Sequence, residues 1–215
     1  MTRILIIALN VFVCTTLAAQ KKNKIALELN YGCNGNFFVR SYEEVSPFST
    51  KNFFNKNFLG TIGGIEMKYD LNKKSRLGFG YARSINSKEI SYTGNYIGVQ
   101  IRDWHITHTD KFFQIFYEKD FSKKMSFLKY HGGIFYLRSN QQEILIKDRP
   151  NGGISYEERN YKNSYLEEGG VFLGVQFSRY IDTKFELGIR TRIYFLISTV
   201  EFNNLTLTPV LTYHF

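Results

Sequence analysis

Apolar and polar side chains alternate along eight segments of the chain. A period of two places successive side chains on opposite faces, so the pattern predicts strands rather than helices. In the last segment, LTLTPVLTYHF, one face carries Leu, Pro, Tyr and Phe, and the other carries Thr, Val and His. The other seven segments are 25–32, 61–71, 77–82, 113–118, 128–136, 171–178 and 185–195. We expect eight strands, each with one apolar and one polar face.

The connectors between these segments alternate in length. Three are short and polar, with the sequences NKKS, SKKM and IDTK, and three are long, at residues 33–57, 86–110 and 138–166. Short turns at one end and long loops at the other are typical of membrane β-barrels with an even number of strands. The pattern therefore predicts an all-β fold, an eight-stranded antiparallel up-and-down transmembrane β-barrel.

Two of the long connectors contain turn sequences flanked by short alternating runs. Gly and Asn occupy the centres at 93–95 and 149–153, which is the composition of hairpin turns. We expect long extracellular hairpins that continue the barrel sheet beyond the membrane. A ten-stranded barrel is not expected, because these arms fall short of the ~9–11 residues that a membrane strand needs. A disordered loop is the alternative.

The first 19 residues have the pattern of a secretory signal peptide. Arg3 precedes an apolar run from Ile4 to Val13, and small residues precede a cleavage site after Ala19. The run is shorter than the ~20 residues of a membrane-spanning helix. A lipoprotein at Cys14 is disfavoured, because Val13 before it is not a small residue. We expect residues 1–19 to be the signal peptide and residues 20–215 to be one barrel domain.

Charged residues recur on the polar face of the predicted strands. In a barrel whose apolar face meets lipid they would point into the lumen, where opposed charges can pair. In a soluble barrel or sandwich the same face would be solvated, and alternation alone does not distinguish the two. The signal segment, the terminal Phe215 and the aromatic strand ends favour the membrane. The predicted lumen charge network is Glu28, Glu66, Lys68, Glu118, Lys129, Glu186, Arg190 and Arg192.

Aromatic residues make up 17% of the chain, and many fall on the apolar face near the short turns. Amphipathic rings favour the interface between membrane and water, although cross-strand pairing would explain the same positions. The predicted membrane-interface aromatics are Tyr69, Tyr117, Phe177, Phe185, Tyr213 and Phe215. Pro209 is discordant, because proline donates no ladder hydrogen bond. We expect a bulge or a missing hydrogen bond there.

Together these features resemble the small OmpA/OmpX-type barrels, and more closely the PorT-like outer membrane protein β-barrel families. The resemblance covers residues 20–215 and rests on the AAQ signal end and on FLGTIGGIEMKYDL, GVFLGVQFSRY, FELGIRTRIYF and LTLTPVLTYHF. It implies the outer membrane of a Gram-negative bacterium, periplasmic termini, and a last strand read by the barrel-insertion machinery. Roles in such families are structural, adhesion-related or secretion-associated. No residue-level functional motif carries over.

The sequence predicts no catalytic, cofactor-binding or metal-binding residue. His105 and His108 follow Trp104 without a cluster of further ligands, so an exposed loop with an interfacial Trp is the favoured interpretation. Some eight-stranded barrels modify lipid A, but no serine is placed with His131, which Gly132 follows. A non-enzymatic structural or surface-interaction role is therefore expected. A narrow channel is the main alternative, and it is disfavoured because the lumen of an eight-stranded barrel is only wide enough for its own side chains to fill.

The formal net charge of +9 bears on partners. A basic exported protein is suited to outer-membrane lipid and to the phosphates of lipopolysaccharide. Nucleic acid is excluded as a partner, because no recognition module is visible. A protein partner at the extracellular hairpins is a further expectation. The apolar anchors available to it in a long connector are Phe37, Phe38, Phe48, Phe53 and Phe54.

Overall fold

The computed structural model describes residues 24–36, 58–93, 100–122, 125–148, 154–160, 166–198, 200 and 202–215. Side chains are described within 24–36, 59–87, 107–122, 125–140, 167–198, 200 and 202–215. The strands in this part are β1 (Ile25–Asn36), β2 (Phe58–Asn72), β3 (Ser75–Thr93), β4 (Gln100–Asp120), β5 (Leu128–Asp148), β6 (Ile154–Asn160), β7 (Leu166–Tyr180), β8 (Phe185–Leu196) and β9 (Phe202–His214). The signal-peptide prediction lies outside the described residues.

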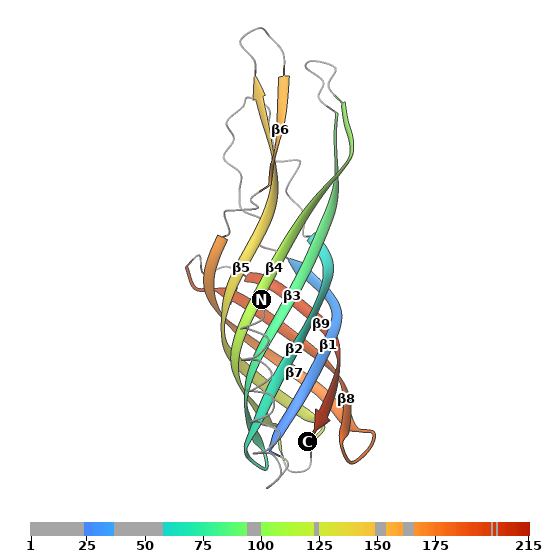
Figure 1. Cartoon of the computed structure of the whole chain (residues 1–215), viewed down its shortest axis with the longest axis vertical. Coiled ribbons are helices and arrows are strands. Elements are labelled where there is room, and N and C mark those ends of the chain that lie inside the picture. The colour runs from blue at the N-terminus through green and yellow to red at the C-terminus, as the bar shows by residue number, and fades with distance from the viewer. Residues whose placement is uncertain are drawn as a thin grey trace, which may run out of the picture.

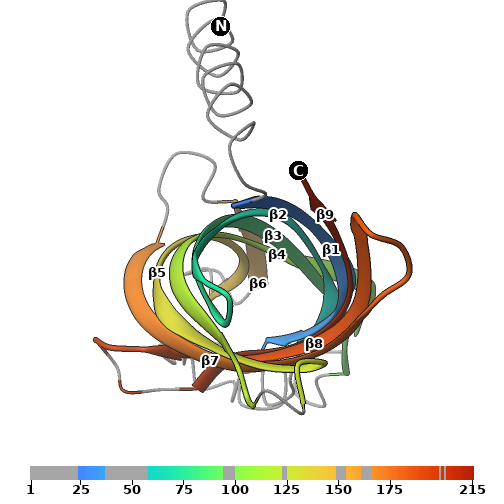
Figure 2. The same ribbon diagram turned by 90° about the horizontal axis from the view of Figure 1, so that it is seen from below.

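Eight of these strands form a closed antiparallel barrel. Each pairs with the next around the ring, in the order β1, β2, β3, β4, β5, β7, β8 and β9, and β9 pairs back to β1. The closing seam runs from Ala26 opposite His214 to Asn36 opposite Asn204, and the backbone N–H of Phe215 donates to the carbonyl oxygen of Ile25 at 3.1 Å. Figure 2 shows the closed ring from below. The predicted eight-stranded barrel is confirmed.

No helix among the described residues is long and apolar enough to cross a membrane.

The ninth strand belongs to one of two arms that extend beyond the barrel. β3 and β4 stay paired as far as Thr93 opposite Gln100, and the outer part of β5 pairs with β6 from Gln142 opposite Asn160. Figure 1 shows both ribbons projecting past the ring, at the end opposite the short turns. The arms therefore add length to the sheet without adding strands to the ring. The segments at 37–57, 94–99 and 149–153 lie outside the described residues.

The sequence placed residues 86–110 in a connector, but most of that segment is strand. Asn86 lies opposite His108 within the β3–β4 pair, and His108 also lies opposite Gln141 of β5. His108 is buried inside the barrel, so the expected exposed loop at this position is wrong. The polar composition that suggested a loop belongs to strands whose inner face is polar. The side chains of Trp104 and His105 lie outside the described set.

Pro209 interrupts the seam between β9 and β1 without changing its register. The pairing runs to Asn30 opposite Val210 and resumes at Cys33 opposite Leu207, so the ladder lacks the two pairs expected between them, Tyr31 with Pro209 and Gly32 with Thr208. The gap agrees with the predicted loss of a hydrogen bond at Pro209, whereas the predicted bulge does not occur there. Register irregularities occur elsewhere, including the step at Tyr194 in the β8–β9 pair. β1 and β9 remain adjacent where the ladder is interrupted.

Candidate functional site

The lumen holds the eight charged residues that the sequence assigned to it. All of them point inward from β1, β2, β4, β5 and β8, and none is more than 3% exposed. Their period-two spacing along each strand explains this placement, because the alternating partners point outward. A charge buried to this degree is strongly destabilising unless other groups pair with it. The hydrogen bonds of each charge therefore determine what the lumen does.

Lys68 lies at the centre and joins two carboxylates from different strands. Its ammonium group donates to Glu28 on β1 at 2.7 Å and to Glu118 on β4 at 2.6 Å. Arg190 on β8 donates to Glu28 and, at 2.9 Å, to Glu66 on β2. Three carboxylates and three cations alternate in this central cluster once Arg192 is included. Each charge is compensated by neighbours on other strands.

Arg192 is the most fully coordinated cation of the cluster. Its guanidinium donates to Glu66, with one N–O distance of 3.0 Å, and to the side-chain oxygen of Gln114 at 2.8 Å. Its Nε donates to Nε2 of His131 at 2.8 Å. The guanidinium carbon Cζ also lies 4.9 Å from the ring centre of Phe116 and 4.8 Å from that of Phe172. Cation–π contacts of this kind strengthen when water is excluded.

Lys129 and Glu186 form a second, smaller cluster nearer the short turns. The Glu186 carboxylate accepts from Lys129 and from the hydroxyl of Ser178, and lies 3.1 Å from Nε2 of His214. Among the described side chains no hydrogen bond joins this group to the central cluster. The sequence grouped all eight charges in one network, whereas the structure places six in one cluster and two in another.

Sequence reasoning missed Arg76, which extends the central cluster toward the short turns. Arg76 donates to Glu118 at 2.8 Å, to Asp70 at 2.9 Å and to Asp120 at 3.2 Å. It shares the inward parity of Gly78 in the next position on that face. Extending the predicted strand at residues 77–82 by one residue toward the N-terminus would have found it.

A buried aromatic layer lies beside the charges. Phe172 stacks on Tyr194 with ring centres 5.4 Å apart, and Phe112 and Phe135 pack against the same tyrosine at 4.9 and 5.3 Å. These rings occupy the face that the sequence described as polar. Where apolar residues occupy both faces of a strand, the alternation of apolar and polar positions is lost, so this aromatic layer was not predicted. It fills the part of the lumen that the charges leave open.

A third layer of amides, hydroxyls and one acid lies on the inner face toward the arms. Asp110 accepts from Asn36 at 2.9 Å and from the hydroxyls of Ser84 and Ser139. Asn34 donates to Asn86 and accepts from Asn204, both at 2.9 Å. These bonds connect β1, β3, β4, β5 and β9 across the lumen. No group of three or more metal-ligating side chains occurs among the described residues.

The three layers make the lumen a packed interior. Arg192, Phe112 and Phe172 are each at most 1% exposed, whereas a water-filled pathway would leave its lining accessible to solvent. His131, the candidate base of an enzyme, accepts a hydrogen bond from Arg192 and lies buried among rings. The arrangement links all eight barrel strands by side-chain contacts, and cross-linking the ring is the chemistry it visibly performs.

The six predicted interface aromatics all lie on the outer face. Tyr213 contacts Phe185 and Phe215, with ring centres 5.1 and 5.0 Å apart, so these three form one cluster at the end of the closing strand. Tyr69, Tyr117 and Phe177 project from β2, β4 and β7 outside this cluster, and the ring of Phe177 packs on that of Phe127 at 5.3 Å. Both cross-strand pairing and an interfacial position are compatible with this geometry.

No protein-family model and no curated protein matches the sequence. Among solved structures, the chain is similar to Neisserial surface protein A, with 12% identity, a TM-score of 0.47, and coverage of 90% of this chain and 98% of that one. It is similar to Ail, the attachment invasion locus protein of Yersinia pestis, with 10% identity, a TM-score of 0.46, and coverage of 89% and 98%. A third match is the N-terminal β-barrel domain of Pseudomonas aeruginosa OprF, with 10% identity, a TM-score of 0.41, and coverage of 88% and 97%. Similarities this distant carry no activity, and the barrel assignment rests on the strand pairing.

Proposed function

We propose that the protein is an integral outer-membrane barrel with a filled, non-conducting lumen and a structural or surface-interaction role. The observation that supports this proposal is that the charged residues lie inside the barrel and the apolar residues outside, the opposite of a soluble protein. Buried charges fill the interior, while the exposed face of the ring carries Leu, Ile, Val, Phe and Tyr on every barrel strand. Soluble monomers rarely expose contiguous apolar patches above a few hundred Å². Lipid is the solvent that suits this outer face.

The closed ring supports the same conclusion through its backbone. In a bilayer every backbone N–H and C=O needs an internal partner, and a closed barrel provides one by removing sheet edges. Here β1 and β9 pair over most of their length. The one interruption includes Pro209, which has no N–H to satisfy. The ring is thus compatible with a solvent that forms no hydrogen bonds.

The proposal includes an orientation. The short turns and the last barrel residue lie at one end and the two arms at the other (Figure 1). In outer-membrane barrels short turns face the periplasm and long loops face outward. We assign both termini to the periplasm and the arms to the cell surface, with β9 as the strand that the insertion machinery reads. Membership of the PorT-like families is part of the same proposal.

The surface-interaction role is assigned to the arms. In the described part of the chain, β6 pairs with β5 alone, and beyond Asn86 the β3 arm pairs with β4 alone. Each arm therefore presents strand edges with unpaired backbone groups, and such edges accept a strand from another chain. A protein partner bound by strand addition is the interaction that this geometry supports.

Membrane insertion is tested by expressing the full chain in a Gram-negative host. We expect it in the outer-membrane fraction, with electrophoretic mobility that changes on boiling, and with external protease cutting in the arms while the ring is protected. Recovery as a soluble periplasmic protein, or cleavage at the short turns from outside the cell, would contradict the proposal. A protein tagged after Phe215 should be inaccessible to antibody on intact cells.

The interaction role is tested by deleting residues 142–160, which removes β6 and its partner segment but leaves all eight barrel strands. We expect crosslinked co-purification from native outer membranes to lose its partner, while the boiling-dependent mobility shift is retained. A matched variant shortens the β3–β4 arm instead and should retain that partner. Capture that survives the 142–160 deletion shows that this hairpin is not the site.

Neither alternative function gains support from the described residues. A narrow channel needs an accessible lining, and the lumen residues are buried. A lipid-modifying hydrolase needs a serine hydroxyl hydrogen-bonded to a histidine that a carboxylate orients. His131 contacts Arg192 and the rings of Phe116 and Phe172, and in the second cluster the Ser178 hydroxyl donates to Glu186, which is also the group that His214 contacts. Hydrolysis of outer-membrane lipids by the purified barrel would revive the enzymatic alternative.

A further inference from the structure

Three cations form a continuous row on the outer face of the barrel, across β3, β4 and β5. Arg83 lies directly opposite Lys111, and Lys111 lies directly opposite Arg138. Opposite residues on neighbouring strands are about 5 Å apart, so the row spans about 10 Å. The side chains of Arg83 and Lys111 form no ion pair within the described part of the chain, and Nε of Arg138 lies 3.6 Å from the Glu167 carboxylate.

The row lies at the edge of the apolar band that faces the arms. Arg83, Lys111 and Arg138 lie eight to ten residues from Ser75, Asp120 and Leu128, where their strands meet the short turns. With a rise of about 3.4 Å per residue and a tilt of about 40°, that distance is roughly 20–26 Å along the barrel axis. The apolar band of an outer-membrane barrel is about 25 Å tall. The cations are therefore level with lipid headgroups.

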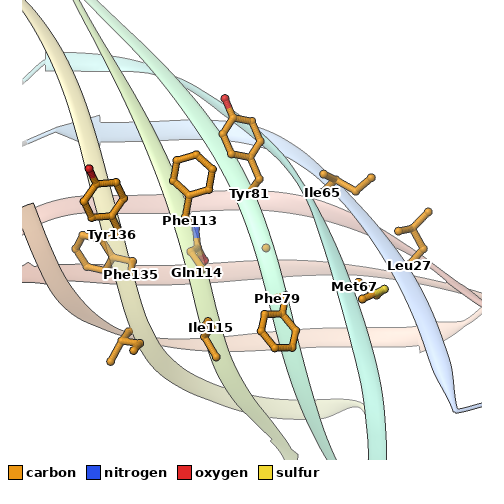
Figure 3. Close-up of a pocket in the computed structure, with 12 residues that line it drawn as sticks. Leu27, Ile65, Met67, Phe79, Tyr81, Phe113, Gln114, Ile115, Phe135 and Tyr136 are labelled. Carbon is orange, nitrogen blue, oxygen red and sulfur yellow. The ribbon is translucent and has the colours of Figure 1, made fainter. Parts of the chain in front are cut away.

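Immediately inside the band, an aromatic row runs parallel to the cations. Tyr81, Phe113 and Tyr136 each lie two residues from one of the cations on the same strand. Their ring centres are 5.2 Å apart for Tyr81 and Phe113, and 6.2 Å apart for Phe113 and Tyr136. Figure 3 shows the three rings side by side over β3, β4 and β5. Tyrosine hydroxyls at this depth can share a polar headgroup with the cations.

Below the rings the outer face is hollowed. A groove of about 640 Å³ runs across β1 to β5, and its floor includes Leu27, Met67, Phe79, Ile115 and Ile134. Figure 3 shows Leu27, Met67, Phe79 and Ile115 lining the groove below the aromatic row. Its surface is almost wholly apolar, and its open side faces outward. Alkyl chains are the groups that this shape and chemistry accommodate.

We propose that the outer face of β3, β4 and β5 is a binding site for a phosphorylated lipid of the outer leaflet, the lipid A part of lipopolysaccharide. Its phosphates contact Arg83, Lys111 and Arg138, its sugar lies over the aromatic row, and its acyl chains enter the groove. Charge complementarity selects this occupant: three adjacent cations face the headgroup layer, and phosphate oxygens form charge-assisted hydrogen bonds with them. The site rests on the proposed membrane insertion and orientation.

The Arg138–Glu167 pair is compatible with this role. Both side chains are about half exposed, and an exposed ion pair contributes little to stability, so a phosphate can replace or join the carboxylate. The opposite end of the barrel provides a matched set of cations. Lys119, Arg179 and Lys184 are also exposed, but they project near the short turns from β4, from β7 and from the turn before β8.

The test compares two triple variants of the full chain, folded in detergent. One is R83Q/K111Q/R138Q, and the control is K119Q/R179Q/K184Q, which removes the same charge at the other end. Binding is measured by native mass spectrometry with diphosphorylated lipid A, with the same lipid stripped of its phosphates, and with inorganic pyrophosphate. Each cation near an anionic headgroup contributes about tenfold or less, so we expect a loss on the order of 100-fold for the first variant. The control should bind like the wild type.

Lipid A bound equally by the first variant and the wild type would overturn the site, as would equal losses in both variants. If the phosphate-free lipid bound as tightly as diphosphorylated lipid A, the cations would not recognise phosphate. Binding of pyrophosphate alone, without the lipid preference, would identify a free anion as the ligand and also overturn the proposal. Both variants should keep the boiling-dependent mobility shift, so failure of the lipid site is distinguishable from failure of membrane insertion.

Discussion

At the scale of single residues, the buried charges of the lumen are stabilised because they share hydrogen-bond partners. Lys68 donates to two carboxylates, and Glu66 accepts from two arginines. Removing one member of such a cluster leaves its partners buried with uncompensated charge. Loss of one partner of a buried ion pair costs about 3–5 kcal/mol, considerably more than the pair adds over an apolar replacement. The lumen charges therefore act as a group.

This sharing predicts the effect of Glu66→Gln. The substitution leaves Arg190 and Arg192 with one carboxylate fewer between them, so we expect the unfolding free energy to fall by about 3 kcal/mol or more. Urea unfolding in detergent micelles, followed by loss of β-sheet circular dichroism, measures this change. The matched control is Asp182→Asn in an exposed short turn, where a change within about 0.5 kcal/mol is expected. Equal midpoints for both variants would contradict the shared-charge account.

A second residue-scale prediction concerns two glycines. A Cβ at Gly32 would lie only 2.8 Å from Cα of Thr208 on the neighbouring strand, whereas a Cβ at Gly169 would meet nothing within 4 Å. We expect Gly32→Ala to destabilise the barrel by about 1–3 kcal/mol, because the strands at the seam would have to separate. Gly169→Ala should be neutral or slightly stabilising. Parallel urea titrations compare the two, and a Gly32→Ala variant as stable as the wild type would show that the seam can widen.

Parity along single strands was enough to place all eight lumen charges on the inner face, because every one of them falls on the parity opposite to the outward apolar residues of its strand. It could not say which charges touch, since contact depends on the register between strands. Glu28 and Thr212 are hydrogen-bonded although 184 positions apart in sequence. Arg76 was missed at a strand end, and the ring of Tyr194 was missed because aromatic residues occupy both faces of β8.

At the scale of the elements, strand count and turn position followed from the sequence, but strand length did not. The predicted strand at 113–118 covers only the part of β4 near its short turn, whereas β4 begins at Gln100. On the proposed membrane insertion the arms lie outside the lipid, where strands need no apolar face, so the alternation ends before the strand does. The arms were predicted from their turn composition and from the short alternating runs on either side of each turn.

The seam between β1 and β9 offers a test at this scale. Pro209→Val would restore the missing N–H at the interrupted step of the ladder. One added backbone hydrogen bond contributes about 0.5–1.5 kcal/mol, so we expect a higher unfolding midpoint in urea. Leu211→Val, at the next outward position of β9, is the control for the change in side-chain size. A lower midpoint for Pro209→Val would show that the proline sets the curvature of the seam.

At the scale of the whole molecule, eight strands enclose a space that side chains fill, and three chemically distinct layers share it. Charges, rings and amides occupy successive parts of the lumen. This division explains how a narrow barrel holds many charges without containing a pore. It also separates stability, which resides in the ring, from interaction, which is assigned to the arms and the lipid-facing surface.

The filled lumen predicts the absence of ion conduction. Purified protein in planar bilayers should give no discrete current steps, while a sixteen-stranded porin treated in the same way serves as the positive control. The variant that lacks residues 142–160 should also give no current steps, because the side chains that fill the lumen lie within the ring. Steps seen with wild-type protein and unaffected by lumen substitutions would point to a contaminant. Steps altered by Phe172→Ala would contradict the packed lumen.

The pairing of β1 with β9 also determines when the molecule can be completed. The first barrel strand emerges from the ribosome with no neighbour on one side, and that neighbour is the last barrel strand to be synthesised. Until then, any assembled sheet has two open edges and an unshielded apolar face, which are the conditions for aggregation. The ring can therefore close only after β9 has been synthesised, as a single late event. If the chain is exported as proposed, the edge of β1 needs protection until that closure.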